Sequence, residues 1–103
     1  MNVYDEMKRI FEVQEEELKS IRDVGEYLDE NVLEIIREQS LGYDGWTTSK
    51  YTLVTGTGGP HVEFDTQYYI RVYWGGEKLE SCTYDEDVRA IINEIEQWLN
   101  ELY

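Results

Sequence analysis

The chain has 103 residues and a formal net charge of −14, with nine Lys and Arg residues against 23 Asp and Glu residues. This length fits one domain, and a hydrophobic content of 41% is sufficient for a core. An acidic surface repels phosphate groups, which argues against direct binding to nucleic acid or to an anionic membrane. We expect a single acidic domain over residues 1–103 whose partner is a basic protein surface.

The N-terminal residues, the hydropathy and the cysteine content bear on the cellular compartment of the protein. The first eleven residues include Asp5, Glu6, Lys8 and Arg9, unlike the apolar run of a signal peptide. No apolar stretch approaches the roughly 20 residues that span a bilayer. Cys82 is the single cysteine, which excludes an internal disulfide and a four-thiolate zinc site. These features predict a cytoplasmic protein.

Residues 1–40 show the spacing of an apolar helical stripe. Hydrophobic residues recur at alternating intervals of three and four positions: Tyr4, Met7, Phe11, Leu18, Ile21, Leu28, Val32 and Ile35, with Gln14 and Gly25 as the weak positions. We predict two helices that break near residues 22–25, because glycine costs about 1 kcal/mol inside a helix. Asp23 and Glu26 also have capping-box spacing there.

The second helix has an alternative start and a predicted end. Asn31 with Glu34 three residues later gives another candidate start, and Gly42 suits the C-terminal cap. One continuous helix that pairs with a second copy as a coiled coil is the competing interpretation.

Residues 41–84 hold nine of the 14 aromatic residues and have the composition of strands. We predict a four-stranded antiparallel meander with strands near residues 48–55, 61–65, 68–74 and 77–84. The loop GTGGP covers residues 56–60, and Gly75-Gly76 forms a two-residue turn. Counting outward from that turn pairs Tyr73 with Lys78, Val72 with Leu79, Arg71 with Glu80, and Tyr69 with Cys82. The predicted core face holds Tyr68, Ile70, Val72, Trp74 and Leu79, and the outer face shows His61, Glu63, Tyr69, Arg71 and Tyr73.

The last segment predicts an amphipathic helix without a miss in its spacing. Its apolar residues are Val88, Ile91, Ile92, Ile95, Trp98, Leu99 and Leu102. Thr83 and Glu86 have capping-box spacing before it. The predicted fold class is therefore α+β, with two N-terminal helices, a four-stranded antiparallel meander and a C-terminal helix packed on one face of the sheet.

Two motifs are candidates for ligand binding. GTGGP lacks the Lys-Ser/Thr pair and the following helix of a phosphate loop, so a hairpin loop is the better interpretation. His61, Glu63 and Asp65 share one strand face and could bind a divalent metal with help from Asp44. Ligands on one strand spread over about 13 Å, however, so a solvated strand face is the alternative. We predict no cofactor and no catalytic residue; a nucleophilic pair of Cys82 and His61 is allowed only by composition.

The stretch YTLVTGTGGPHVEF, residues 51–64, resembles a strand–TGGP–strand stretch in small uncharacterised proteins of plasmids, phages and other mobile elements. No activity is known to us for those proteins, so the resemblance implies no catalytic role. The resemblance implies that the protein belongs to a mobile element, and counter-defence proteins are common among the proteins of such elements.

Acidic helices provide the most specific functional hypothesis. Carboxylates one helical turn apart lie about 6 Å from each other, close to the spacing of successive phosphates on one nucleic-acid strand. Exposed tyrosines on the sheet are typical protein-interface anchors. The predicted interaction residues are Glu12, Glu15, Glu16, Asp87, Glu94, Glu101, Tyr69 and Tyr73.

We therefore expect a non-enzymatic protein that binds a basic surface, in its most specific form a nucleic-acid mimic that inhibits a nucleic-acid-binding host protein. One alternative is a small metal- or ligand-binding domain that uses His61, Glu63 and Asp65. Another is a structural homodimer. Acidity that serves solubility alone is the plain interpretation of the charge.

Overall fold

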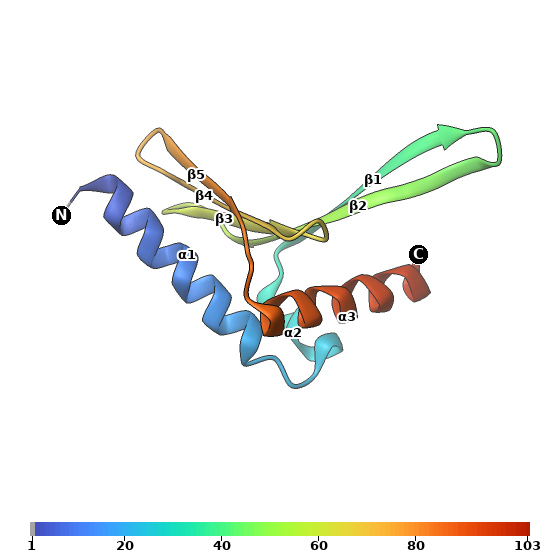
Figure 1. Ribbon diagram of the computed structural model, residues 1–103, viewed down its shortest axis with the longest axis horizontal. Coiled ribbons are helices and arrows are strands. Elements are labelled where there is room, and N and C mark those ends of the chain that lie inside the picture. Colours follow the sequence, from blue (N-terminus) through green and yellow to red (C-terminus); the bar gives the residue numbers. More distant parts are fainter. Residues whose placement is uncertain (1) are drawn as a thin grey trace.

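The computed structural model describes residues 2–103, and within them three helices and five strands form an α+β fold. The helices are α1 (Val3–Lys19), α2 (Val24–Asn31) and α3 (Glu86–Leu102). The strands are β1 (Glu34–Gly42), β2 (Gly45–Gly56), β3 (His61–Asp65), β4 (Tyr69–Trp74) and β5 (Glu77–Cys82). Neighbouring strands pair antiparallel in chain order, and the helices lie together on one face of the sheet (Figure 1).

The predicted break between the first two helices is confirmed. The side chain of Asp23 accepts a hydrogen bond from the Glu26 N–H at 3.1 Å, as an N-cap does. Gly25 lets α2 approach α3, since a Cβ atom there would lie 2.9 Å from Trp98 Cζ2. The continuous coiled-coil helix is wrong, because Met7 and Leu18 of its stripe are buried within this single chain.

The segment predicted as the end of the second helix is instead strand β1. Helix α2 ends at Asn31, and Val32 is already extended. Gly42 pairs with Gly45 in a hairpin and caps no helix. The β-branched residues of this segment favour a strand, and pairing with β2 supplies the hydrogen bonds. Over residues 2–103 the meander therefore has five strands and not four.

The far part of the β1–β2 hairpin, residues 36–50, projects beyond the helices (Figure 1) and is called the arm below. The pairing of β1 with β2 shifts register between Glu38 and Gln39, and such a bulge bends and twists a hairpin. Ser49 donates a hydrogen bond from Oγ to the Glu38 carbonyl at this point. At the root, Arg37 lies over the Tyr103 ring, 5.6 Å from its centroid.

Strands β4 and β5 confirm the predicted hairpin. The register pairs Tyr73 with Lys78 and Arg71 with Glu80, and Gly75 and Gly76 have φ values of 58° and 80°. GTGGP forms the β2–β3 hairpin loop as predicted. Ile70 and Val72 are buried on the core face, whereas the predicted core residue Trp74 is exposed at the strand end.

Helix α3 closes the core against the sheet. Its N-cap is Asp85, whose Oδ1 accepts from the Asp87 and Val88 N–H groups, so the predicted cap at Thr83 is wrong. The fully buried cluster of sheet and helix residues contains Leu18, Tyr51, Leu53, Phe64, Ile70, Val88, Ile92, Ile95 and Leu99. Of the predicted helix face, Trp98 and Leu102 remain exposed. Among residues 2–103 no helix combines the length and apolarity needed to cross a membrane.

Candidate interaction surface

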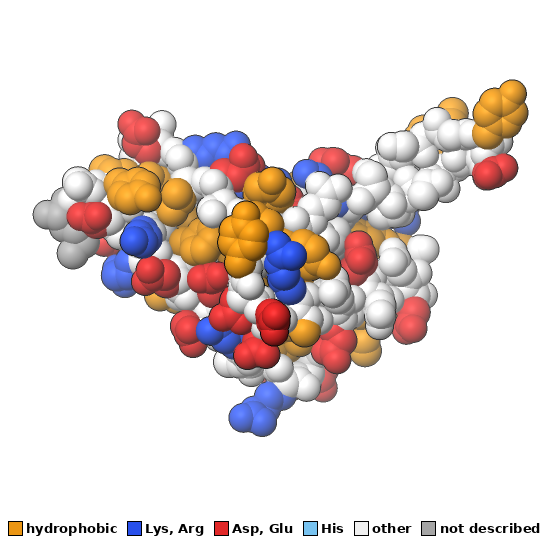
Figure 2. Space-filling view, in the orientation of Figure 1, with side chains coloured by type: hydrophobic (Ala, Val, Ile, Leu, Met, Phe, Trp, Pro, Cys, Tyr) orange, Lys and Arg blue, Asp and Glu red, His pale blue; other side chains and the backbone are white. Residues whose placement is uncertain are grey.

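Negative charge is concentrated on the helical layer. Residues 1–33 and 83–103 contain 16 of the 23 acidic and five of the nine basic residues, a net charge of −11. Residues 34–82, which form the sheet, have a net charge of −3. Acidic side chains gather below the sheet in the space-filling view (Figure 2). Most of the net negative charge therefore lies in the helical layer.

On α1 the predicted acidic residues separate into two roles. Glu12 and Glu16 are exposed and line a shallow hollow of about 550 Å³. Glu16 also binds Lys19 at 3.3 Å. Glu15 accepts a hydrogen bond from the Thr83 hydroxyl at 2.6 Å, so it fastens α1 to the segment before α3. Glu12 therefore remains available on this surface, Glu16 is exposed but shares Lys19 with Asp85, and Glu15 has a structural partner.

On α3, Asp87, Glu94 and Glu101 are exposed along one flank, as predicted from their spacing. Asp87 and Glu94 line a hollow of about 190 Å³ that Leu18 and Lys19 of α1 share. Glu94 and Glu101 line a second hollow, of about 380 Å³, with residues around the start of α2. The flank therefore faces the α1 and α2 surface and extends its acidic character.

One ion pair joins the two long helices. Lys19 Nζ lies 2.7 Å from Asp85 Oδ2. Hydrogen bonds to Asp85 and then Glu16 raise the pKa of Lys19 to about 12, and the Lys19 bond lowers the pKa of Asp85. Lys19 neutralises part of the surface at this point. Glu94 and Glu101 form no ion pair within residues 2–103.

The outer face of the sheet carries an ion-pair cluster around Arg71. Within the described residues, Arg71 binds Glu63 at 2.9 Å, Glu80 at 2.7 Å and also Asp65. Burial lowers the pKa of Arg71, but the hydrogen bonds to Glu80 and Asp65 outweigh it and raise that pKa. Asp65 is 0% exposed and accepts the N–H groups of Gln67 and Tyr69 on its other oxygen. This cluster ties β3, β4 and β5 together.

The three candidate metal ligands belong to this cluster. His61 Nε2 lies 2.9 Å from Glu63 Oε1, and the other Glu63 oxygen binds Arg71. Asp44 lies in the β1–β2 turn at the tip of the arm and not beside β3. In the part of the chain that the structure describes, no group of three His, Cys, Asp or Glu residues could hold a metal ion. The sequence predicted that these residues share a strand face. It did not predict that Arg71 binds Glu63 and Asp65, although Arg71 stands directly opposite Glu63 in the β3–β4 register.

Among the remaining predicted residues, Tyr73 and Cys82 have local partners. Tyr69 is exposed, while Tyr73 packs edge-on against His61 with ring centroids 5.3 Å apart. Cys82 Sγ lies 3.2 Å from an Arg89 nitrogen, so the structure pairs Cys82 with Arg89 and not with His61. Of the two tyrosines, Tyr69 is the one free to contact a partner.

The arm is an exposed apolar feature that we missed because β1 was predicted as helix. Its tip presents Leu41, Tyr43 and Trp46, with Trp46 66% exposed and Tyr43 fully exposed. Hydrophobic side chains are visible at this tip in Figure 2. Residues 36–50 contain two basic and two acidic residues, so the arm is neutral in a chain of net charge −14. The available signal was the Tyr-Asp-Gly sequence at residues 43–45 between residues of strand type.

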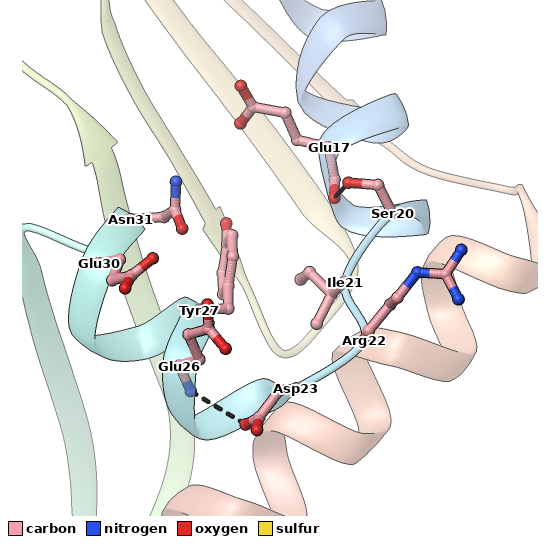
Figure 3. Close-up of a pocket in the computed structure, with 9 residues that line it drawn as sticks. All are labelled: Glu17, Ser20, Ile21, Arg22, Asp23, Glu26, Tyr27, Glu30 and Asn31. Carbon is pink, nitrogen blue, oxygen red and sulfur yellow. Dashed lines mark hydrogen bonds between the residues drawn. The ribbon is translucent and has the colours of Figure 1, made fainter.

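A second missed feature is a hollow between the end of α1 and α2, with Tyr27 at its floor (Figure 3). Tyr27 is 7% exposed, and its hydroxyl has no hydrogen-bond partner among residues 2–103. Burial raises the pKa of Tyr27 to about 12; the nearby Gln14 amide acts in the opposite direction, and the charge of Glu17 adds to the increase. Helical periodicity alone could not place Tyr27 against α1.

The stability of the protein is expected to fall between about pH 10 and pH 12 in a way that depends on Tyr27. The unfolded chain ionises this phenol near its ordinary pKa of 10, whereas the folded chain holds the proton to about pH 12. The free energy of unfolding should therefore lose up to about 2–3 kcal/mol as the pH rises through this range. Urea denaturation of the natural chain and of Tyr27→Phe at a series of pH values measures the difference.

Tyr27→Phe should lack this part of the alkaline loss, since it removes the titrating group. Lys19 contributes a loss of the same sign, because its pKa is raised to about 12 as well, so Lys19→Gln separates the two. Identical alkaline curves for the natural chain and Tyr27→Phe would contradict the burial of this phenol.

Comparisons of the chain with protein-family models, with curated proteins and with solved structures give no match.

Proposed function

We propose that the helical layer binds a basic surface of another protein, with the nucleic-acid-binding cleft of a basic protein as the most specific partner. The observation that carries this proposal is the separation of charge, with −11 in the helical segments against −3 in the sheet. Concentrated charge of one sign steers a partner of the opposite sign and accelerates association. Inhibition by occupying the cleft follows if nucleic acid and this chain compete for it.

Spacing of the carboxylates supports the mimicry of nucleic acid. Glu12 and Glu16 are one turn apart on α1, which places their Cβ atoms about 5–6 Å from each other. Asp87, Glu94 and Glu101 repeat every seven residues along α3, or about 10 Å per interval. A basic cleft that accommodates a row of phosphates could accommodate these rows of carboxylates in their place.

The arm supplies a different kind of contact. Binding energy at protein interfaces is concentrated in a few aromatic anchors, while charges mainly set the association rate. A two-stranded hairpin that extends from its sheet is marginally stable in water on its own. The exposed Leu41 and Trp46 stand opposite each other in the arm register. We therefore assign the arm the anchoring role and the helical layer the steering role.

Two charge variants of equal net charge test the proposal. A tagged chain first captures partners from a nuclease-treated lysate under stepped salt, and association rates are then measured with a purified partner. Glu94→Gln with Glu101→Gln alters the helical layer, and Glu34→Gln with Glu77→Gln alters exposed positions of the sheet by the same charge. We expect the first pair to slow association about tenfold and the second to have little effect.

Two further measurements test the proposal: competition with nucleic acid and the salt dependence of association. The nucleic acid of the partner should displace the chain, and Trp46→Ala should increase the dissociation rate with little change in association. An equal decrease in association rate for both double variants would show that only the net charge of the chain matters, and not the location of the carboxylates. Association that is insensitive to salt would overturn the electrostatic proposal.

A further inference from the structure

The hollow above Tyr27 has the composition of a site for a cation. Its volume is about 440 Å³, and it lies between the end of α1, the following loop and α2 (Figure 3). The residues that line it are Glu17, Ser20, Ile21, Arg22, Asp23, Glu26, Tyr27, Glu30 and Asn31. Four of these side chains are carboxylates and one is a guanidinium, which gives the lining a net charge of −3.

Most of this charge is unused by the fold. Glu17, Glu26 and Glu30 are exposed and form no ion pair within residues 2–103. Asp23 has a structural task as the N-cap of α2. In Figure 3 the Arg22 side chain points away from the carboxylates of α2. The hollow thus presents three uncompensated carboxylates on two helices.

Tyr27 gives a second observation that does not depend on the surface charge, because its buried hydroxyl forms no hydrogen bond within residues 2–103. Tyr27 is only 7% exposed. Its hydroxyl points between α1 and α2, toward the space between Glu17 and Asn31 (Figure 3). Gln14 is the polar side chain close to this hydroxyl and acts against the burial that raises the pKa of Tyr27, but its Oε1 already accepts from Thr55 and its Nε2 is itself a donor. The proton of the Tyr27 hydroxyl therefore has no acceptor in the described residues, and Gln14 Nε2 has no partner there either. Buried polar groups of folded proteins are almost always hydrogen-bonded, so such an orphan calls for an explanation.

We propose that this hollow binds a primary ammonium or guanidinium group between Glu17 and the carboxylates of α2. The N–H donors of such a group can reach several separate acceptors, and guanidinium has five of them. One Glu17 oxygen then binds the cation while the other accepts the proton of the Tyr27 hydroxyl, which satisfies the orphan donor. A bare metal ion is a poorer occupant, because no three ligands converge in the described part of the chain.

Two sources could supply this chemistry: a Lys or Arg side chain of a protein partner, or a free polyamine. The first source rests on the proposed function, since it makes the hollow a socket within the acidic helical layer. Small amines added to the protein alone test the hollow without any partner. Failure of the hollow and failure of the proposed function are therefore separate results.

Binding is measured by isothermal titration and amide NMR shifts in 150 mM NaCl, with agmatine, spermidine and N-acetyl-arginine methylamide as probes. Tetramethylammonium is the matched control ligand, because it carries the charge without an N–H donor. We expect agmatine to shift the amides of Glu17 and residues 26–31 and tetramethylammonium to bind at least about tenfold more weakly. Binding of N-acetyl-arginine methylamide points to a side-chain source, and binding of spermidine without it points to a free polyamine.

Variants locate the site. Glu17→Gln should weaken agmatine binding about fivefold or more, whereas Glu77→Gln, the same charge change at an exposed position of β5, should leave it unchanged. Tyr27→Phe removes a hydroxyl that has no partner, so the variant should fold normally. It should bind agmatine more weakly than the natural chain does. Equal losses from Glu77→Gln and Glu17→Gln, or tetramethylammonium binding as tightly as agmatine, would overturn the proposal.

Discussion

Replacing Arg71 with methionine is expected to lower the free energy of unfolding by about 3–5 kcal/mol, because it leaves a buried carboxylate without its main partner. Asp65 is 0% exposed and Arg71 is 11% exposed in the side chain, so water cannot take over the lost contacts easily. Lys50 Nζ, 3.6 Å from Asp65, is the one other cation in contact with it among residues 2–103. Urea denaturation at pH 7 gives the difference.

Arg9→Met is the matched control, with the same chemical change at an exposed position. Arg9 is 61% exposed and pairs with Glu6 one turn away, so its loss should leave the urea midpoint nearly unchanged. Adding Asp65→Asn to Arg71→Met should restore part of the stability, since the amide oxygen can still accept from Gln67 and Tyr69. A loss below about 1 kcal/mol for Arg71→Met would show that the cluster contributes little net stability, as some buried ion pairs do.

Elements with strong local signals were predictable from the sequence. The Gly75-Gly76 turn fixes the β4–β5 register, because shifting it by one residue would turn every side chain to the other face. Helix α3 needs no distant partner to be recognised, since its apolar stripe repeats without interruption. The N-cap at Asp23 likewise depends on a contact only three residues away.

Strand β1 was beyond such reasoning because its decisive contacts are nonlocal. Val32 and Ile35 fit the end of a helical stripe, and short apolar runs are ambiguous between helix and strand. The choice is made by pairing, in which Ile35 meets Leu53 and Arg37 meets Tyr51. The arm follows from the same pairing and was missed with it.

The sequence could predict which residues are exposed on the candidate surface, but not which contacts their side chains make. Helical spacing places Asp87, Glu94 and Glu101 on one flank, and they are exposed there. That Glu15 binds Thr83, 68 positions away, depends on how α1 packs beside the end of β5. Tyr27 belongs to the same class, since its burial and its orphan hydroxyl arise where α2 packs beside α1.

Phe64→Ala is expected to lower the free energy of unfolding by about 3–5 kcal/mol, because it opens a cavity at the centre of the sheet. Phe64 stands between Leu53 of β2 and Ile70 of β4 in the register, and these three side chains are all fully buried. They form the row on which the helices rest. Urea denaturation monitored by circular dichroism gives the loss, with an unchanged slope expected if the variant folds as the natural chain does.

Tyr43→Ala is the control for removing an aromatic ring, since Tyr43 is fully exposed at the tip of the arm and should change stability by about 0.5 kcal/mol or less. Phe64→Leu fills most of the cavity and should cost about 1–2 kcal/mol. Equal losses from leucine and alanine would mean that the ring shape, and not the cavity, determines the cost. Small losses from both would contradict the register, because residues of β3 alternate between this core row and the Arg71 cluster on the outer face.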